Sequence, residues 1–205
     1  MNKKICIGIP CFQSASFEVL DDYMRLAFHL GRRVPEYDFM VAVKGKSEQF
    51  RARNAIVTAA IQNACDFLLM LDDDHIIDID KGTQPTPRYD FVRTLARHLE
   101  DDPSKGIVGA LYYQRADQPY PVIMDETPDG ATFFYHNSEV SGGLQQVKVT
   151  GGGCMMINMK VFDRIDQPWF APEFEFGTDI QVCKSVRKAG WGVWCDTSID
   201  RKSVV

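Results

Sequence analysis

The chain has 205 residues, of which 45% are hydrophobic and 25% are charged, so it can form one globular domain with a full hydrophobic core. Its net charge of −5 argues against a nucleic-acid partner, and no stretch approaches the roughly 18 apolar residues that a membrane span requires. The first apolar run, Ile5–Ile9, is too short for a signal peptide, so we expect a cytoplasmic protein without a transmembrane segment.

The first half of the chain alternates strands with helices. The expected strands are Lys4–Ile9, Asp38–Val43, Asp66–Leu71 and Ile107–Tyr112. The expected helices run from Ser16 to about Leu30, from Ser47 to about Ala64, and over Tyr89–Leu99. Both serines are of a type that caps helices, and Gly31 is expected to stop the first helix. This alternation predicts an α/β fold with a mostly parallel central sheet flanked by helices.

Each expected helix has an apolar face at helical spacing, and we expect this face to pack on the sheet. In the first helix it holds Phe17, Leu20, Met24, Ala27 and Phe28. In the second it holds Ile56, Val57, Ala60 and Ile61, and in the third Phe91, Leu95 and Leu99.

The second half of the chain is less regular. Prolines, polar clusters and alternating stretches over residues 117–150 predict a small antiparallel excursion, with strands near Ala131–Tyr135 and Gln145–Val149. The elements expected after Gly151-Gly152-Gly153 are a strand at Cys154–Ile157, a short helix at Lys160–Ile165, a helix from Thr178 to Gly190 and a strand at Trp191–Cys195. The residues expected inside the last helix are Ile180, Val182, Cys183 and Val186.

The six cysteines predict reduced thiols rather than a disulfide framework. None forms a CxxC pair, and most lie in apolar segments, where cysteine acts as a small buried hydrophobic residue. Reduced thiols are typical of cytosolic proteins. Cys11 is the exception, because it follows the first expected strand and could be exposed.

Three aspartates, Asp72-Asp73-Asp74, directly follow the apolar run Phe67–Leu71. Such a run is typical of a buried strand, and ligands of open α/β sheets bind at the carboxyl ends of the strands. Carboxylates this close repel one another, so a bound cation is the natural counter-charge, and oxygen ligands favour Mg²⁺ or Mn²⁺. Such an ion is suited to hold a diphosphate. A solvated acidic turn is the alternative.

Further segments accompany this cluster in a fixed order. They are Ile9-Pro10, Arg53-Asn54, Leu69–Asp74, Thr150–Ile157, Trp169-Phe170, Gly177–Ile180 and Arg187–Asp196. As an ordered set, they make the chain from about Ile5 to Asp196 resemble GT-A-fold glycosyltransferases, specifically those like glycosyltransferase family 2. The resemblance implies one GT-A (Rossmann-like) domain over residues 1–205, with a nucleotide-binding half at 1–112 and an acceptor and catalytic half at 113–205.

The resemblance also implies an activity, the metal-dependent transfer of a sugar from a nucleotide-diphosphate sugar, expected to be a UDP-sugar, to an acceptor hydroxyl. Asp72 and Asp74 would be the DxD carboxylates that hold Mn²⁺ or Mg²⁺. The residues expected to bind the nucleotide-sugar are Pro10, Cys11, Phe12, Gln13, Lys44, Arg53, Asn54, Asp72, Asp73, Gly152 and Gly153. A surface salt bridge is the alternative for Arg53, and a solvated acid for Asp73. The glycines would let the sugar approach the backbone.

Asp179 stands where the resembling family has its general base, which would take the proton of the acceptor hydroxyl while the sugar inverts. Thr178 and Asp179 also suit a helix N-terminus, where they would stabilise free N–H groups. The next candidates for the base are Asp73 and Glu175. Trp169 and Phe170 are expected to form an acceptor platform, with core packing as the alternative.

The chain departs from the family pattern in three places. The tail after Asp196 has no histidine to complete the metal site, so water or His75 could fill that position. Thr178 replaces the Glu of a Glu-Asp pair, and Lys44 lies where the second strand usually ends in an acid. A sugar-nucleotide-binding protein with little or no turnover and a sugar nucleotidyltransferase therefore remain alternatives, although the glycine-rich basic loop of the latter is missing. The sugar, the acceptor (glycan, lipid or protein), the stereochemistry and the oligomeric state are left open.

Overall fold

The computed structural model describes residues 2–11, 15–76, 89–114, 116–171 and 177–203. The helices are α1 (Phe17–Arg33), α2 (Gln49–Gln62), α3 (Phe91–Asp101) and α4 (Thr178–Lys188), with short 3₁₀ helices η1 (Asn137–Glu139) and η2 (Met159–Asp163). The strands are β1 (Lys3–Cys11), β2 (Tyr37–Gly45), β3 (Phe67–Leu71), β4 (His75–Ile76), β5 (Lys105–Tyr112), β6 (Ile123–Glu126), β7 (Thr132–Phe134), β8 (Leu144–Gln146), β9 (Val149–Thr150), β10 (Cys154–Asn158) and β11 (Gly192–Ser203).

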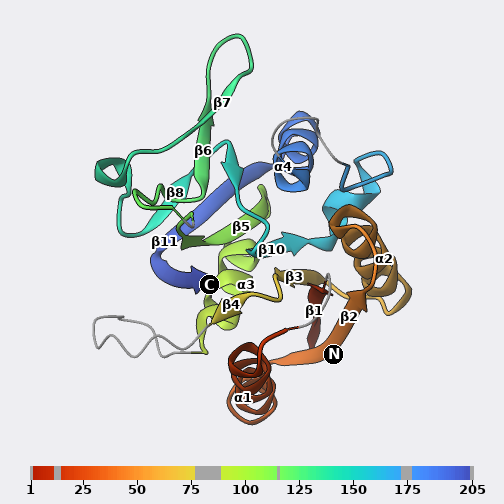
Figure 1. Cartoon of the computed structure of the whole chain (residues 1–205). Coiled ribbons are helices and arrows are strands. Elements are labelled where there is room, and N and C mark those ends of the chain that lie inside the picture. The colour runs from red at the N-terminus through yellow and green to blue at the C-terminus, as the bar shows by residue number, and fades with distance from the viewer. Residues whose placement is uncertain (1, 12–14, 77–88, 115, 172–176, 204–205) are drawn as a thin grey trace.

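The main sheet is mostly parallel, as predicted (Figure 1). It has eight strands in the order β2-β1-β3-β10-β5-β11-β4, with β8 also paired to β11. Strands β1, β2, β3, β5 and β11 run in one direction, whereas β10 lies antiparallel between β3 and β5. The carboxyl ends of β1, β3 and β5 therefore meet at one edge of the sheet.

Helices cover both faces of this sheet. On one face α1 and α3 pack through residues such as Leu30 and Leu95, and on the other α2 and α4 pack through Val57 and Val182. All five residues of β3 are buried, and they alternate between the two clusters. A strand covered on both faces needs a continuous apolar run, which explains why the segment before the aspartates has no polar residue.

Helix α1 begins where it was predicted to begin, but the opposite face of the helix packs on the sheet. Ser16 is its N-cap and accepts a hydrogen bond from the Val19 backbone N–H, at 3.3 Å. The helix continues past Gly31, and the face predicted to be buried is exposed. The prediction was wrong because α1 has two apolar faces, and the sheet covers the one that contains Val19, Leu26 and Leu30.

Helix α2 begins one residue later than predicted. Its N-cap is Glu48 rather than Ser47, and the side chain of Glu48 makes no capping hydrogen bond. Ile56, Val57 and Ala60 are buried as predicted, but Ile61 is 47% exposed.

The predicted antiparallel excursion is present as a separate three-stranded sheet in the order β7-β6-β9. Strands β4 and β6 were not predicted, because β4 has only two residues and the apolar residues of β6 follow two prolines closely. The short helix after β10 is a 3₁₀ helix, and β11 runs on to Ser203, well beyond its predicted end at Cys195.

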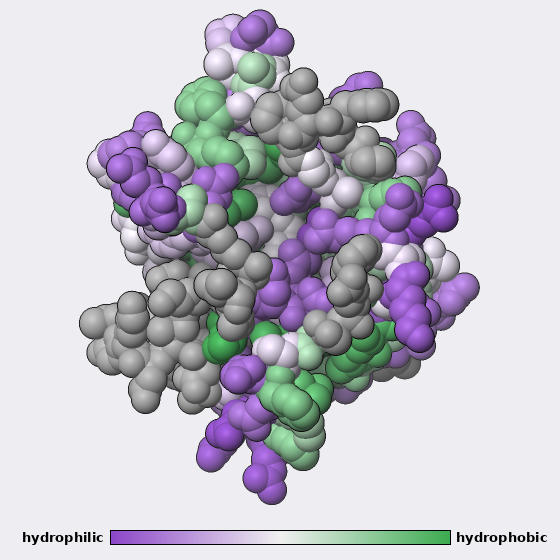
Figure 2. All heavy atoms as spheres, in the orientation of Figure 1, coloured by the Kyte–Doolittle hydropathy of each residue, from purple (hydrophilic) through white to green (hydrophobic). Residues whose placement is uncertain are grey.

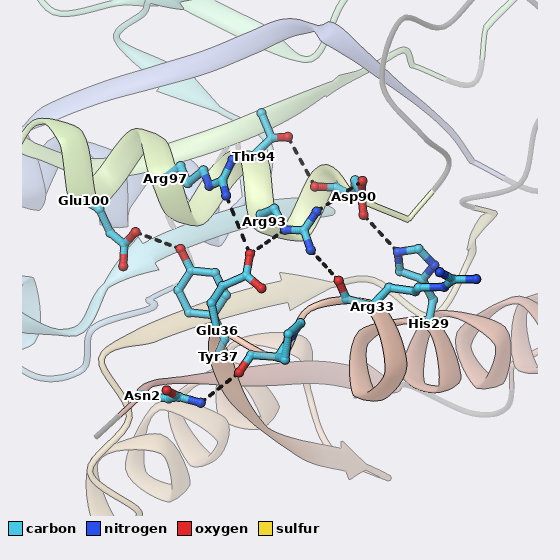
Figure 3. A network of polar contacts seen from close by, with 11 residues as sticks. Asn2, His29, Arg33, Glu36, Tyr37, Asp90, Arg93, Thr94, Arg97 and Glu100 are labelled. Carbon is cyan, nitrogen blue, oxygen red and sulfur yellow. Dashed lines mark hydrogen bonds and ion pairs between the residues drawn. The ribbon is translucent and has the colours of Figure 1, made fainter.

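A polar network fastens α1 and β2 to α3 (Figure 3). His29 Nε2 lies 2.9 Å from Asp90 Oδ1, and Arg93 Nε lies 2.6 Å from Glu36 Oε1. The Tyr37 hydroxyl adds a bond of 2.8 Å to Glu100. These contacts hold the C-terminal end of α1 and the start of β2 against α3.

No disulfide joins any of the six cysteines, all of which lie in the described parts of the chain, and five of them are buried. Cys11 is half-buried, and burial together with a hydrogen bond to Asp73 raises the pKa of its thiol. Among the described residues, no helix is both long enough and apolar enough to cross a membrane.

Candidate metal and transfer site

The aspartates lie at the carboxyl edge of the sheet, directly after β3. Asp72 and Asp74 are half-buried, and His75 is only 3% exposed. One ligand atom from each of these three residues lies within 4.8 Å of the others. Two carboxylates and an imidazole at this spacing form a set that could hold a divalent ion such as Mn²⁺ or Mg²⁺.

His75 is placed in this set by the last strand of the chain. It begins β4, which pairs antiparallel with β11 so that His75 is opposite Ser203. Its Nε2 atom lies 3.7 Å from Asp74 Oδ1, and its ring stands edge-on to Tyr112 with the centroids 4.7 Å apart. The imidazole therefore comes from the acidic segment, and β11 supports that segment rather than supplying a histidine to it.

Arg53 joins the acidic segment to the start of α4. It is 2% exposed, and its Nη2 atom lies 3.0 Å from Asp72 Oδ1, while Nη1 donates a 2.5 Å hydrogen bond to Thr178 Oγ1. Burial lowers the pKa of the guanidinium, but the charges of Asp72 and Asp179 outweigh this and raise the pKa overall. Arg53 thus stays charged and holds Asp72 in one orientation.

Asp179 lies on the other side of Arg53, in the first turn of α4 and half-buried. Its Oδ2 atom accepts a hydrogen bond of 3.0 Å from the backbone N–H of Gly152. The N-cap of α4 is Gly177, which has no side chain to cap the helix, and Thr178 accepts from Arg53. The described bonds of Thr178 and Asp179 therefore go to neighbouring segments and not to free N–H groups of their own helix.

The three glycines before β10 are required by close packing. A Cβ atom on Gly152 would lie 2.6 Å from Arg53 Nη2, and one on Gly153 would lie 2.5 Å from His75 Nε2. A Cβ on Gly151 would overlap the Tyr112 hydroxyl. Any larger residue would therefore displace a side chain of the site, which is a different reason for glycine from the sugar contact expected from the sequence.

Two tyrosines belong to the site and were not predicted. The Tyr112 hydroxyl accepts a 3.1 Å hydrogen bond from Gly153 N–H, and the Tyr23 hydroxyl of α1 donates to the Asp72 carbonyl. Burial, followed by nearby acidic groups that include Cys154 for Tyr23, Asp179 for Tyr112 and Asp72 for both, raises the pKa of each phenol well above the ordinary value. Tyr112 ends a predicted strand at the edge where Asp72 lies, a signal that could have found it, whereas nothing in the sequence pointed to Tyr23.

The residues expected near the nucleotide lie at the end of β1 and beside it. Pro10 is buried, Cys11 is half-buried, and they are in register with Lys44 and Gly45 of β2. Lys44 is exposed. Asp73 hydrogen-bonds the Cys11 side chain at the end of β1, and it does not belong to the ligand set of Asp72, Asp74 and His75. The predicted contacts Phe12 and Gln13 lie outside the described residues, as does Glu175.

Asn54, Trp169 and Phe170 form a separate contact. Asn54 Nδ2 donates a 2.7 Å hydrogen bond to the Phe170 carbonyl, and Asn54 Oδ1 accepts one of 3.2 Å from Phe170 N–H. Trp169 and Phe170 are 7% and 0% exposed, and Trp169 packs edge-on against Phe162. Asn54 therefore fastens this segment to α2, and both aromatic rings lie in the core.

Comparison with known proteins bears on the fold. No protein-family model and no curated protein matches the chain. Among solved structures, A197 from STIV matches 99% of this chain and 86% of its own length, with 15% identity and a TM-score of 0.62. The mannosyltransferase PcManGT from Pyrobaculum calidifontis, in complex with GDP-Man and Mn²⁺, matches 100% of this chain and 58% of its own, with 10% identity and a TM-score of 0.59.

GalNAc-T7 with UDP, GalNAc and Mn²⁺ matches 100% of this chain and 44% of its own, with 9% identity and a TM-score of 0.55. The chain thus spans about half the length of each of these two transferases, 58% and 44%. At such low identity the likeness concerns the fold alone. The chain has the fold of the GT-A glycosyltransferases that its sequence resembles.

Proposed function

We propose that the protein is a metal-dependent glycosyltransferase that moves a sugar from a nucleotide-diphosphate sugar to an acceptor hydroxyl. The observation that carries the proposal is the cluster of Asp72, Asp74 and His75, with ligand atoms within 4.8 Å of one another at the carboxyl edge of a GT-A sheet. The two transferases that share the fold were solved with nucleotides and Mn²⁺, which supports a nucleotide and a divalent ion as ligands of this chain.

Asp72, Asp74 and His75 would hold the Mn²⁺ or Mg²⁺ ion. When bound, such an ion acts as a Lewis acid that stabilises the leaving diphosphate. The buried charge of Arg53 orients the Asp72 carboxylate, because Arg53 Nη2 lies 3.0 Å from Asp72 Oδ1. The nucleotide would lie toward the end of β1, near Pro10, Cys11 and Lys44, and we expect uridine.

Asp179 is the proposed general base. The acceptor oxygen would attack the anomeric carbon, the bond from that carbon to the diphosphate oxygen would break, and the acceptor proton would pass to Asp179. The hydrogen bond from Gly152 N–H fixes the carboxylate without consuming both of its oxygen atoms. Attack opposite the leaving diphosphate inverts the sugar.

A thermal-shift panel tests the metal and the donor together. We expect UDP-sugars to raise the melting temperature only when Mn²⁺ or Mg²⁺ is present, because a ligand stabilises the native state by RT ln(1 + [L]/Kd). GDP- and CDP-sugars are measured in the same way, and the largest shift identifies the nucleobase that the site prefers. Asp74→Asn should abolish the shift, whereas Asp101→Asn, which changes an exposed carboxylate at the end of α3, should leave it intact. Equal stabilisation in EDTA would refute the metal role.

Asp179→Asn tests the base. We expect kcat to fall by at least about 10²-fold, since a general base typically contributes roughly 10²–10⁴-fold. Asparagine keeps an oxygen that can accept the bond from Gly152, so the melting temperature should stay close to that of the wild type. Transfer of label from a radioactive UDP-sugar and thermal melting are measured on the same variant. Full activity in the Asp179→Asn variant would exclude Asp179 as the general base. If the wild type binds the donor but transfers no sugar, the protein is a sugar-nucleotide-binding protein and not a transferase.

A further inference from the structure

Helix α1 presents an apolar face to solvent, opposite the face that packs on the sheet. We call Phe17, Leu20, Met24 and Phe28 the outer stripe; their exposed fractions are 87%, 52%, 52% and 68%. Their spacing of three, four and four residues places them along one side of the helix. The apolar residues of the inner face are buried, so the outer stripe is not needed to hold α1 on the sheet.

Exposed apolar side chains are concentrated at this place. Of the nine large hydrophobic side chains that are exposed in the described parts of the chain, six belong to the outer stripe or are Val41 and Val43. These valines occupy every second position of β2 together with Tyr37 and Phe39, so all four lie on the sheet face that α1 covers. Figure 2 shows hydrophobic side chains gathered at the bottom of the molecule, where α1 lies. A cluster of this kind usually marks an interaction surface.

The charges beside the stripe are mostly positive. Arg25 pairs with Asp21, and Glu36, which lies between α1 and β2, pairs with Arg93 and Arg97. The other exposed charged residues of α1, of β2 and of the position directly after β2 are Arg32, Arg33, Lys44 and Lys46 against Glu18 and Asp38. This is an excess of basic residues in a chain whose net charge is −5. Long basic side chains can lay their stems along an apolar surface while their charged ends reach anionic groups.

We propose that the outer stripe docks on the surface of an anionic lipid bilayer. An amphipathic helix with basic flanks lies in the plane of such a surface with its apolar face at the boundary of headgroups and acyl chains. A second copy of the chain fits less well, because a stable protein interface takes roughly 20–30 residues from each partner. The outer stripe and the two valines supply six.

The outer stripe begins at the end of the molecule that carries the site. Tyr23, on the same helix, donates its hydroxyl to the carbonyl of Asp72, so α1 touches the acidic segment directly. The first turn of α1 follows the carboxyl end of β1, which lies at the same edge of the sheet as Asp72. The N-terminal end of the outer stripe therefore lies at the same end of the molecule as the metal cluster.

Vesicle flotation with the full chain tests this proposal without any measurement of activity. We expect the wild type to float with vesicles of phosphatidylcholine containing phosphatidylglycerol, and to bind pure phosphatidylcholine more weakly. The double variant Phe17→Gln with Phe28→Gln should bind anionic vesicles at least about 10-fold more weakly, because it removes two apolar side chains from the contact. Phe133→Gln, which changes an exposed phenylalanine on β7, is the matched control and should bind as the wild type does.

A second variant guards against loss of folding in the first. Phe28→Trp keeps an apolar residue at a position that is 68% exposed, and its fluorescence should shift to the blue when anionic vesicles are added. Absence of wild-type binding, or no shift in Phe28→Trp, would overturn the proposal. So would binding by a folded double variant that equals the wild type. A wild type that is dimeric in sedimentation, becomes monomeric on the double substitution and ignores vesicles would assign the stripe to a second copy instead.

Discussion

Arg53 has a charge that is buried between two parts of the chain. It contacts Asp72 after β3 and Thr178 at the start of α4, at 3.0 and 2.5 Å. Loss of one member of such a pair leaves the other charge buried and uncompensated. Arg53 is therefore a residue whose removal should affect stability as well as function.

Arg53→Ala should lower the free energy of unfolding by about 3–5 kcal/mol, the usual cost of breaking a buried ion pair. Arg51 provides a control on the same helix, since its pair with Glu48 has side chains that are 69% and 63% exposed. Arg51→Ala should cost no more than about 1 kcal/mol. Urea titration of both variants measures the difference, and equal losses would mean that the buried pair adds nothing.

Alanine substitutions at two glycines should change the free energy of unfolding in opposite directions. Gly152→Ala places a Cβ 2.6 Å from the guanidinium of Arg53, so we expect a loss of about 1–3 kcal/mol in the free energy of unfolding. Gly31→Ala, within α1, meets no atom within 4 Å and should gain about 0.5–1 kcal/mol from helix propensity. Thermal or urea unfolding reports both, and a stabilised Gly152→Ala would contradict the close packing.

The residues of the site differ in how much the sequence reveals about them. The acidic cluster could be predicted because a continuous apolar run fixes a buried strand and the aspartates follow it at once. Tyr23 could not, because it reaches Asp72 through the packing of α1 on the sheet, across 49 residues of sequence. The partner of Asp179 was equally hidden, since it is a backbone N–H in a glycine segment.

At the scale of elements, α1 shows where hydrophobic periodicity is ambiguous. Both of its apolar faces have helical spacing, and the one with the larger side chains is the exposed one. The buried face includes Asp22, which accepts a 2.9 Å hydrogen bond from the Tyr89 hydroxyl. A carboxylate lowers the apparent hydrophobicity of the face that is buried, so the sequence alone favours the wrong side.

The start of α1 offers a test at this scale. Ser16→Ala should cost about 1 kcal/mol of the free energy of unfolding, because the Val19 N–H loses its capping partner. Ser47 was predicted to cap α2 but does not, so Ser47→Ala should change the free energy of unfolding by less than about 0.5 kcal/mol. Chemical denaturation distinguishes the two, and a larger loss in Ser47→Ala would restore the sequence-based assignment.

The order and direction of strands were only partly predictable. Alternating strands and helices implied the parallel group, and the structure confirms it. The sequence gives no sign that β10 turns antiparallel, because a strand buried on both faces has the same apolar composition in either direction. The pairing of β4 with β11 was also hidden, because it depends on how the last strand crosses the sheet.

At the scale of the whole molecule, β10 joins the two parts of the main sheet, because it lies between β3 and β5. A fragment of residues 1–146 keeps β3 and β5 but lacks the strand that joins them, together with α4 and β11. We expect this fragment to show no cooperative unfolding transition by circular dichroism in urea, in contrast to the full chain. A sharp transition in the fragment would show that its first 146 residues form a stable unit.

The position of β10 has a consequence during synthesis. Strand β3 ends at Leu71, whereas its neighbour begins at Cys154. At a translation rate of about 5–20 residues per second, roughly 4–17 s pass between the synthesis of β3 and the synthesis of β10, and this edge of β3 is unpaired during that time. An uncovered apolar edge can pair with another nascent chain. The yield of folded protein should therefore depend on the speed of translation between these strands, even for variants whose final stability is unchanged.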